Sequence, residues 1–341
     1  MKRFYLFRSN LRIFEYYHKF KDLETFRKNC HDYYLLFSLW LLEKNYFDEV
    51  VIWRLHDNQV SDIVFEINGK QFIQRWVHDF QQVVKFPSCD ISFWRGGFPE
   101  YDSVTKKFPK HFGFKIYLGA GKRVFSQWNG KYDLFLVEDE QDINNHYPCA
   151  LFYKTASPFI FFPKPELKKK WDICWPCNFT QLRYKGQEEF IRLISKSDFL
   201  AHLKIVHCGN KTEVGQKLCQ KYGVNNISFL GYKSRNELNT ILNCSKLGLN
   251  YSNHLDGCPR VSTEILMSGT PLLISKQTRL LDYYKKFGVV VLQESDNPEQ
   301  TIKESVDNYN NLSNEVQKAI RYELSFDTIN EKNIREWLSN I

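Results

Sequence analysis

The C-terminal half of the chain alternates short apolar runs with amphipathic stretches. The apolar runs predict strands at residues 171–177, 203–207, 227–230, 247–251, 271–274 and 289–292. Between them, apolar positions three and four residues apart predict helices at residues 187–195, 212–222, 235–242, 261–267 and 279–287. Strands that alternate with helices are typical of a parallel sheet covered by helices, so we expect an α/β domain here.

Local signals place several helix ends within this half. Ser234, followed three residues later by Glu237, is a capping-box pattern that predicts a helix start. Gly223 follows an amphipathic stretch and predicts a C-terminal cap. Asn297 before Pro298 predicts another helix start, with the proline in the first turn.

The N-terminal half is less regular but of the same type. Its apolar runs predict strands at residues 4–7, 50–53, 91–94, 114–118 and 134–137, and residues 33–42 predict a buried helix. Gly96 and Gly97 follow one of these strands, and Gly119 and Gly121 follow another. Glycine-rich turns after parallel strands are where open sheets usually bind ligands, although a simple turn is an equal alternative at both places.

A proline-containing stretch separates the two halves. Residues 157–170 contain three prolines and show no regular hydrophobic period, which is typical of a linker. We therefore expect a Rossmann-like N-terminal domain over residues 1–160 and a second one over residues 161–325. Residues 326–341 carry apolar positions at helical spacing and predict a final helix. Two doubly wound domains that face each other across a cleft are the architecture this pattern favours.

The composition excludes several other classes of protein. No apolar run approaches the roughly 20 residues that a membrane-spanning helix needs. The start of the chain is too charged for a secretory signal, and the nine cysteines are scattered, so a cytoplasmic location is expected. The net charge of +8 is spread out, and its densest run, three lysines at residues 168–170, leaves a peripheral membrane contact open. No basic stripe with interleaved aromatic residues is present, so nucleic-acid binding is not expected.

The sequence gives only weak evidence for a metal site or for a redox-active pair of thiols. None of the nine histidines is paired at the spacing of metal ligands, so no metal site is expected. Cys174 and Cys177 form a Cys-x-x-Cys motif, but the surrounding residues read as a strand, whereas a redox-active pair begins a helix. No second pair completes a zinc site, so a structural role is favoured for both thiols.

The segment from residue 247 to residue 274 carries the candidate chemistry. Gly257 allows backbone to approach a ligand closely, and the loop ends near Arg260 and Val261 at a predicted helix start. The unpaired N–H groups of such a helix start favour a phosphate, and Arg260 adds a cation. Asp256 and Glu264 bracket this anion site and can accept hydrogen bonds from hydroxyl groups. A diphosphate between a sugar and a ribose would match all of these parts.

This segment resembles the donor-site signature of GT-B glycosyltransferases of the family 4 type, the glycosyl transferases group 1. In that signature two acidic residues, with seven residues between them, precede a small-residue turn and a buried strand. Asp256 and Glu264 have this spacing and precede Gly269 and Pro271. Further matches follow in the family's order at Lys185-Gly186, Gly209 and residues 229–231. The resemblance covers most of residues 160–295 and extends to residues 152–163, which are similar to the family's run into its linker.

The resemblance implies a role for each matching residue. Lys185 and Arg260 would stabilise the charge on the departing diphosphate, and Asp256 would hold a hydroxyl group of the transferred sugar. Glu264 would bind the ribose hydroxyl groups, and Gly209 would let the backbone pass close to the nucleotide. The remaining donor-binding positions, along the phosphates and the sugar, would be Gly257, Cys258, Pro259 and Val261.

The sequence departs from the family pattern at three places. The first acidic residue is Asp256, where glutamate is usual. The arginine that relatives place five residues before the Lys-Gly pair is Thr180 here, and nearby Arg183 would serve instead. A histidine that many relatives carry in the first domain is absent around Gly119 and Gly121. The two glycine turns of the first domain remain the candidate acceptor-side or sugar-facing loops.

The resemblance implies a hexosyl-type glycosyltransferase that works with retention and needs no metal or other cofactor. Its partners would be a nucleoside-diphosphate sugar and a glycan or lipid-linked acceptor with a free hydroxyl group, in glycan or surface-polysaccharide synthesis. The final helix would pack back on the N-terminal domain. The absent histidine keeps a second interpretation open, a GT-B-like protein that binds a nucleotide or glycan without turnover. A dinucleotide-dependent enzyme is disfavoured, because residues 8–10 after the first strand contain no glycine.

Overall fold

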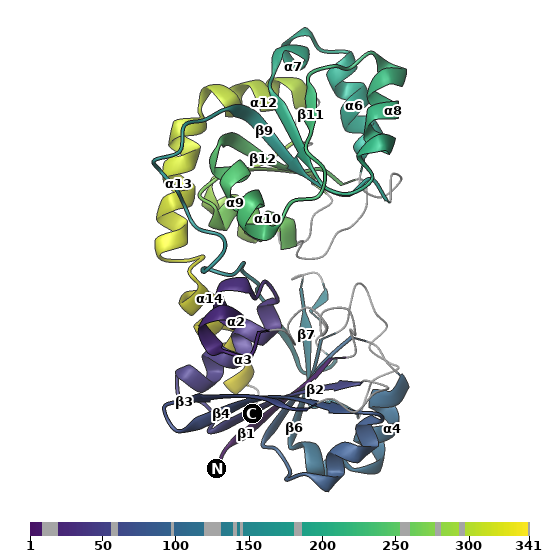
Figure 1. Ribbon diagram of the computed structural model, residues 1–341, viewed down its shortest axis with the longest axis vertical. Helices are drawn as coiled ribbons and strands as arrows, with labels where there is room; N and C mark the ends of the chain where they lie inside the picture. Colours follow the sequence, from purple (N-terminus) through teal and green to yellow (C-terminus); the bar gives the residue numbers. More distant parts are fainter. Residues whose placement is uncertain are drawn as a thin grey trace. The chain divides into compact units, whose positions relative to one another are not determined.

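The computed structural model describes residues 1–8, 20–55, 61–96, 99–118, 131–138, 142–143, 146–180, 186–252, 260–276, 281–292 and 297–339. The chain divides into two compact units (Figure 1). The first unit contains Met1–Tyr153 and Asn330–Ile341, and the second contains Lys154–Ile329. The chain therefore leaves the first unit once and returns to it at its C-terminal end.

A mainly parallel sheet forms the centre of the first unit. Within the described residues its strand order is β3-β4-β2-β1-β5-β6-β7-β8, and β3 with β4 is the antiparallel pair. The interior strands β1, β2 and β5 are almost continuously apolar, because helices cover both faces of the sheet. The strands are β1 (Arg3–Arg8), β2 (Glu49–Leu55), β3 (Ile63–Ile67), β4 (Lys70–Val77), β5 (Ile91–Arg95), β6 (Phe114–Leu118), β7 (Leu134–Val137) and β8 (Cys149–Leu151).

The hairpin of β3 and β4 was not predicted from the hydrophobic pattern. Asn68 and Gly69 connect the two strands, with φ angles of 53° and 76°. Left-handed angles at both positions are those of a two-residue type I′ turn, for which Asn-Gly is a preferred pair. β3 alternates buried and exposed residues, as expected of an edge strand with one face in solvent.

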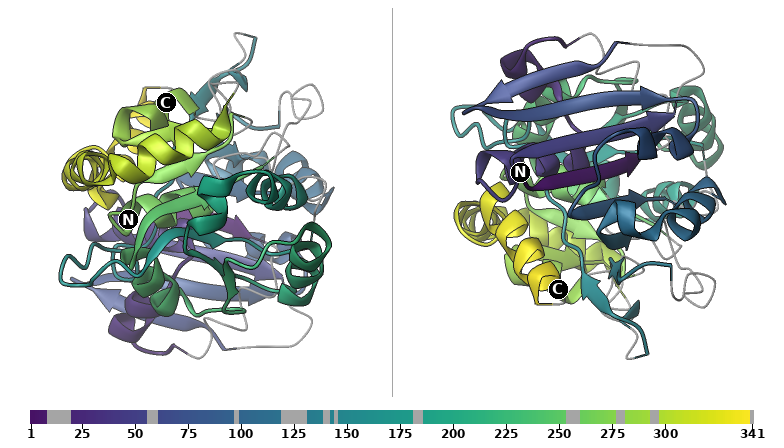
Figure 2. Two further views of the ribbon diagram at one scale, coloured as in Figure 1. Left: turned by 90° about the horizontal axis from the view of Figure 1, so that it is seen from above. Right: turned by 90° about the horizontal axis from the view of Figure 1, so that it is seen from below.

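Helices cover the two faces of the first sheet. One face carries α2 (Leu23–Asn29), α3 (Tyr33–Glu43) and the end of α14 (Phe326–Leu338) (Figures 1 and 2). The other face carries η1 (Phe80–Lys85), α4 (Pro99–Lys107) and η2 (Pro109–Phe112). On this second face Phe7 and Trp94 are stacked, with ring centroids 3.7 Å apart. α3 is buried along nearly its whole length, which confirms the buried helix predicted for residues 33–42.

The end of α14 is part of the core of the first unit. Trp337 is 1% exposed, and its ring centroid lies 5.1 to 5.9 Å from those of Phe37, Phe93 and Phe152. The Asn333 side chain donates to the backbone carbonyl of Tyr153 at 2.8 Å and accepts from its N–H at 2.9 Å. These contacts join the last residues of the chain to the end of the first sheet.

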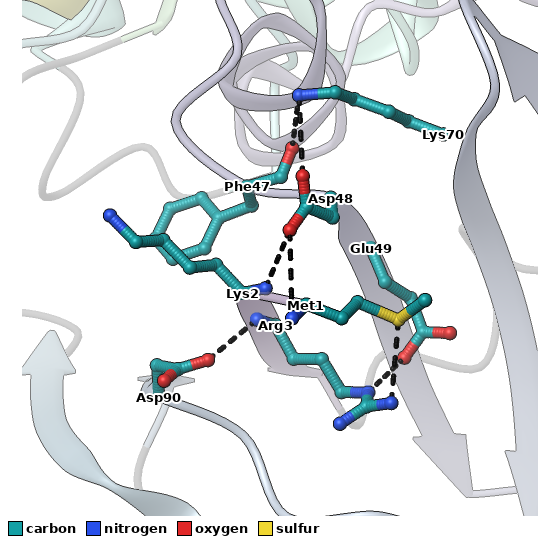
Figure 3. Close-up of polar contacts among 8 residues, drawn as sticks. All are labelled: Met1, Lys2, Arg3, Phe47, Asp48, Glu49, Lys70 and Asp90. Carbon is teal, nitrogen blue, oxygen red and sulfur yellow. Dashed lines mark hydrogen bonds and ion pairs between the residues drawn. The ribbon is translucent and has the colours of Figure 1, made fainter.

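At the amino-terminal edge of the first sheet, carboxylates lie beside cations and backbone donors (Figure 3). Asp48 lies 3.5 Å from the Lys70 ammonium, and Glu49 accepts a hydrogen bond from Arg3 Nε at 2.9 Å. Asp90 accepts from the backbone N–H of Arg3 at 2.7 Å. Charge at this edge is therefore locally compensated.

A wholly parallel sheet forms the centre of the second unit. Within the described residues its order is β11-β10-β9-β12-β13-β14, and each neighbouring pair is parallel. The strand order reverses between β9 and β12, which is the doubly wound arrangement. The strands are β9 (Trp171–Pro176), β10 (Ile205–Cys208), β11 (Ile227–Phe229), β12 (Ser245–Asn250), β13 (Leu272–Ile274) and β14 (Val289–Val291).

Most helices of the second unit follow the predicted pattern, but those at Asp198–His202 and Tyr309–Arg321 were not predicted. The helices of this unit are α6 (Gln187–Ser195), α7 (Asp198–His202), α8 (Thr212–Tyr222), α9 (Arg235–Asn243), α10 (Arg260–Met267), α11 (Leu281–Tyr284), η5 (Lys285–Phe287), α12 (Pro298–Asp307) and α13 (Tyr309–Arg321). The capping box of Ser234 and Glu237 is formed, Gly223 caps α8 with a φ of 70°, and Asn297 caps α12. The expected α/β class, with two Rossmann-like parallel-sheet domains, is confirmed. In the described part of the chain, no helix is both long and apolar enough to span a membrane.

Candidate functional site: a polar cavity in the second unit

A cavity of about 350 Å³ lies at the carboxyl-terminal edge of the second sheet. Its walls come from the ends of β9 and β10, from the turn after β11, and from the first residues of α9 and α10. The carboxyl edge of an open parallel sheet, near the reversal of strand order, is where such sheets usually bind ligands. Its lining includes Cys177, Gly209, Lys233, Arg235, Arg260 and Glu264.

Gly209 forms a part of the wall that only glycine fits. A Cβ atom at this position would lie 1.7 Å from the carbonyl oxygen of Cys177. The N–H of Gly209 donates to the carbonyl of Gly231 at 2.9 Å, which fixes the turn after β10 against the turn after β11. A ligand in the cavity can therefore approach the backbone of residue 209 without an intervening side chain.

Glu264 is the buried acid of the cavity. Its side chain is 2% exposed; one carboxylate oxygen lies 2.8 Å from Arg235 Nη1, and the other lies 3.4 Å from Arg260 Nε. Burial raises the pKa of Glu264 above its usual value, while the two arginines act in the opposite direction. Because a carboxylate oxygen can accept more than one hydrogen bond, Glu264 retains acceptor capacity for hydroxyl groups.

Cations outnumber carboxylates in the described lining of the cavity. Lys233, Arg235 and Arg260 all line it, whereas Glu264 is the one carboxylate among the lining residues that the structure describes. Lys233 lies 4.0 Å from Glu237, and its side chain is 28% exposed. This excess of positive charge suits a phosphate or diphosphate, which arginine side chains bind with two donors at once.

The packing of α10 places its first residues at the cavity. A Cβ atom on Gly248 of β12 would lie 2.4 Å from the side chain of Ile265, so the helix rests directly on the strand. The Asn250 amide donates to the Ser262 hydroxyl at 3.0 Å across the same interface. The strand therefore sets the position of Arg260 at the helix start.

The Cys-x-x-Cys motif lies in a strand, as predicted. Cys174 is fully buried in β9, and Cys177 follows the strand at the cavity wall. Burial raises the pKa of the Cys174 thiol well above its usual value, whereas a redox-active pair needs a lowered one. Among the described residues both cysteines are free thiols.

The structure brings four of the sequence-predicted site residues together. Gly209, Arg260, Val261 and Glu264 all line the cavity. Gly96 follows β5 in the first unit, with a φ of 103°. The other predicted site residues lie outside the described residues: Asp256, Gly257, Cys258, Pro259, Lys185, Arg183, Gly97, Gly119 and Gly121.

The sequence pattern did not indicate the cations that follow β11 at the cavity. Tyr232, Lys233 and Arg235 line the cavity, and Arg235 is the closer of the two arginine partners of Glu264. The signal was available, since a glycine turn followed by basic residues comes directly after a predicted parallel strand. The capping-box pattern of Ser234 and Glu237 predicted only a helix start at this place.

In the parts of the chain that the structure covers, no three histidine, cysteine, aspartate or glutamate side chains are grouped so that they could hold a metal ion.

Comparisons with known proteins relate part of the chain to one family. A model of the glycosyl transferases group 1 matches residues 166–323, whereas a search of curated proteins found no match. Solved structures similar to this chain include sucrose-phosphate synthase from Thermosynechococcus elongatus, with a TM-score of 0.68, 10% identity and 99% of each chain covered. The lipopolysaccharide outer core galactosyltransferase WaaB has a TM-score of 0.65 and 14% identity, with 100% of each chain covered. HepE from Anabaena, in complex with UDP, has a TM-score of 0.67 and 10% identity over 100% of each chain.

These likenesses bear on different parts of the protein. At such low identities the structural matches show the fold, which is the two-domain GT-B architecture over the full chain. The family match covers the second sheet and the residues of the cavity described above. Residues 166–323, slightly less than half of the chain, therefore match the glycosyl transferases group 1, a family of retaining glycosyltransferases that use nucleotide-sugar donors.

Proposed function

We propose that the protein transfers a hexosyl group from a nucleoside-diphosphate sugar to a hydroxyl group of a glycan or lipid-linked acceptor, with retention. The second unit would bind the donor, and the first unit would bind the acceptor. The reaction would serve glycan or surface-polysaccharide synthesis in the cytoplasm, as the family resemblance suggests. The observation that carries this proposal is the cavity in which Glu264 lies buried beside Arg235 and Arg260.

The chemistry of the cavity suits the nucleoside part of such a donor. A ribose presents two adjacent hydroxyl groups, and the two oxygen atoms of Glu264 can accept a hydrogen bond from each. Gly209 has no side chain and lines the cavity, so a flat base or a ribose could lie against its backbone. The volume of about 350 Å³ falls within the range of small-molecule sites.

The diphosphate would lie among the cations of the lining. Arg235, Arg260 and Lys233 would compensate its charge without a metal ion. The same charges would stabilise the departing diphosphate, where negative charge grows as the glycosidic bond breaks. From the family resemblance, Lys185 would add to this stabilisation, and Asp256 would hold a hydroxyl group of the transferred sugar.

A binding panel and a turnover assay test the proposal separately. Calorimetric titration with UDP, GDP, ADP and CMP, with EDTA and then with magnesium, should reveal one preferred nucleoside diphosphate that binds equally well in both. The corresponding labelled nucleotide sugar should then be slowly hydrolysed, and NMR should show that the released sugar keeps its anomeric configuration.

Asp256→Asn sharpens the test, because it should reduce turnover while leaving the affinity for the nucleoside diphosphate unchanged. Glu213→Gln, an exposed acid on α8, is the matched control and should change neither quantity. Binding without hydrolysis or transfer would support the alternative of a nucleotide-binding protein without turnover. No binding of any nucleotide would contradict both.

A further inference from the structure

A second cavity lies in the second unit, apart from the cavity assigned to the donor. Its volume is about 550 Å³, within the range of small-molecule sites. One wall is the entry segment (residues 163–169), which leads into β9, and another wall is α13 (Figure 1). Because β9 begins at Trp171 and β13 begins at Leu272, the cavity lies at the amino-terminal edge of the second sheet. The donor cavity lies at the opposite edge of the same sheet.

The walls of this second cavity are fixed to each other. A Cβ atom on Gly269, whose φ is 77°, would lie 3.1 Å from side-chain atoms of Pro163, so the entry segment packs against the turn after α10. The Asn243 side chain at the end of α9 accepts from the backbone N–H of Lys164 at 2.6 Å. From α13, the Ser313 hydroxyl donates to the carbonyl of Gly269 at 3.4 Å. The same turn therefore positions both the entry segment and α13.

α13 presents an uncharged polar face to the cavity. Four of its side chains, spaced three or four residues apart on one face of the helix, line the cavity: Asn310, Ser313, Asn314 and Gln317. The Gln317 amide donates to the Ser313 hydroxyl at 3.3 Å, whereas the amides of Asn310 and Asn314 have no partner among the described residues. A side-chain amide offers donors and an acceptor together. This face therefore suits a ligand that also presents donors and acceptors side by side.

The entry segment adds positive charge to the cavity. Lys169 is half-buried and donates to the carbonyl of Asn243 at 2.8 Å, and burial lowers the pKa of its ammonium group. Lys164 donates to a hydroxyl group of α9, and Lys168 is exposed. Among the described residues, none of these three lysines has a carboxylate partner. Glu166, which is exposed, is the one carboxylate in the described lining, so cations exceed carboxylates there.

The lining offers little to an apolar ligand. Among its described residues, the apolar side chains are two prolines, Leu167 and Tyr309, and Tyr309 packs against the hydrophobic core. An apolar peptide or an acyl chain would cover the amides of α13 without a hydrogen bond, which costs free energy. A sugar presents hydroxyl groups on adjacent carbon atoms, each a donor and an acceptor at once. A carboxylate or phosphate on that sugar would accept charge-assisted hydrogen bonds from the lysines.

We propose that this second cavity binds an acidic oligosaccharide, a glycan segment that carries carboxylate or phosphate groups. The amides of α13 bind its hydroxyl groups, and Lys168 and Lys169 bind its acidic groups. Resting on the proposed function, the ligand is a part of the acceptor or product glycan remote from the reacting hydroxyl group. Since the two cavities lie at opposite edges of the sheet, the glycan is held here without contact with the donor.

Calorimetric titration with four ligands tests the class of compound. Hexagalacturonate carries carboxylates, maltohexaose phosphorylated on one glucose carries a phosphate, unmodified maltohexaose is neutral, and hexaglutamate carries charge without a sugar. At least one of the two acidic oligosaccharides should bind about tenfold or more tightly than maltohexaose and hexaglutamate, and added salt should weaken this binding. The one that binds more tightly identifies the acidic group as carboxylate or phosphate.

Variants of α13 and of the entry segment locate the binding. The double variant Asn310→Ala with Asn314→Ala should weaken the acidic oligosaccharide about 5- to 100-fold, because two neutral hydrogen-bonding groups are lost. Lys168→Gln should weaken it about 2- to 5-fold, since its charge is exposed. Asn311→Ala and Lys318→Gln, at exposed positions of α13 outside the lining, are the matched controls and should change nothing. Unfolding temperatures measured in parallel show that each variant folds.

Three results would overturn the proposal. Equal affinity of the acidic oligosaccharide for wild type and for the double variant of α13 would remove the site. Hexaglutamate or maltohexaose binding as tightly as the acidic oligosaccharides would show that charge alone, or the sugar alone, is recognised. Absence of binding of both acidic oligosaccharides would overturn the site as well.

Failure of this inference differs from failure of the proposed function. The double variant of α13 should bind the preferred nucleoside diphosphate as wild type does, because its two positions lie outside the donor cavity. Arg260→Gln, which alters the donor cavity, should keep the binding of the acidic oligosaccharide. Oligosaccharide binding that depends on α13, with no binding of any nucleoside diphosphate, would keep this site and remove its link to glycosyl transfer.

Discussion

His207 makes the second unit sensitive to acid. Its ring is buried and lies among the rings of Trp175, Phe179 and Phe229. With the carbonyl of Cys177 2.8 Å away, Nε2 carries the hydrogen and donates it, whereas Nδ1 meets no partner among the described residues. A proton on Nδ1 would therefore add a charge and an unpaired donor to an apolar core.

The size of the effect follows from the pKa. Burial lowers the pKa of His207 from 6.5 to about 4, against the opposing hydrogen bond to Cys177. The unfolded chain keeps the ordinary value and takes up its proton first, so this contribution is complete above pH 6.5 and is lost as the pH falls to about 4. At about 1.4 kcal/mol for each pKa unit, the free energy of unfolding should fall by about 3 kcal/mol over this range.

Urea unfolding at several pH values measures this loss. The transition is followed by tryptophan fluorescence, because the Trp175 ring lies 5.8 Å from that of His207. His207→Gln keeps an N–H donor but does not titrate, so it should lose about 3 kcal/mol less than wild type between about pH 6.5 and about pH 4. His202→Gln, at an exposed position, is the control and should follow wild type. Parallel curves for wild type and His207→Gln would show that protonation of His207 does not cause the loss of stability.

Other parts of the fold and site make further predictions. Gly209→Ala would place a Cβ 1.7 Å from a backbone carbonyl oxygen, so thermal denaturation should show a loss of about 1–3 kcal/mol, and no loss would contradict the packing at the cavity wall. Trp337→Ala should destabilise the first unit by about 3–5 kcal/mol in urea unfolding, whereas Leu338→Ala, at a 53% exposed position, should cost little. Arg235→Gln removes the closer cation from Glu264, so the pKa of that acid should rise further. As the pH falls, the variant should therefore lose affinity for the nucleoside diphosphate sooner than wild type does. Calorimetry at several pH values measures this, and identical pH profiles for the two proteins would argue against the pairing.

Hydrophobic pattern alone predicted the second unit closely. The helices predicted at 187–195 and 212–222 coincide with α6 and α8, because both stretches are amphipathic and Gly223 ends the second of them. The predicted helix at 279–287 is instead a short α11, described from Leu281, followed by the 3₁₀ turn η5. In the first unit, the β3–β4 hairpin and β8 were not predicted. β3 and β8 are short strands at the two edges of the sheet, and β4 mixes polar with apolar residues, so all three carry little hydrophobic signal.

The candidate site was predictable only in part. Glu264 and Arg260 lie one helical turn apart, so their spacing in the chain already placed them on one face. Arg235 reaches Glu264 from 29 residues away, and such a pairing depends on the order of strands in the sheet. In the first unit, Arg8, Arg54 and Arg95 are likewise far apart in the sequence, and the register of neighbouring strands places them side by side.

The assignment of Glu264 as the acceptor for the ribose hydroxyl groups is central to the proposed donor site. The most direct measurement is the calorimetric affinity of wild type and Glu264→Gln for the preferred nucleoside diphosphate and for pyrophosphate. Glu264→Gln should weaken the nucleoside diphosphate by about 10- to 100-fold, because a charged acceptor is lost, and should leave pyrophosphate binding equal or stronger, because Arg235 and Arg260 lose their counter-charge. An equal loss for both ligands, or no loss for either, would contradict the assignment of the cavity as the donor site.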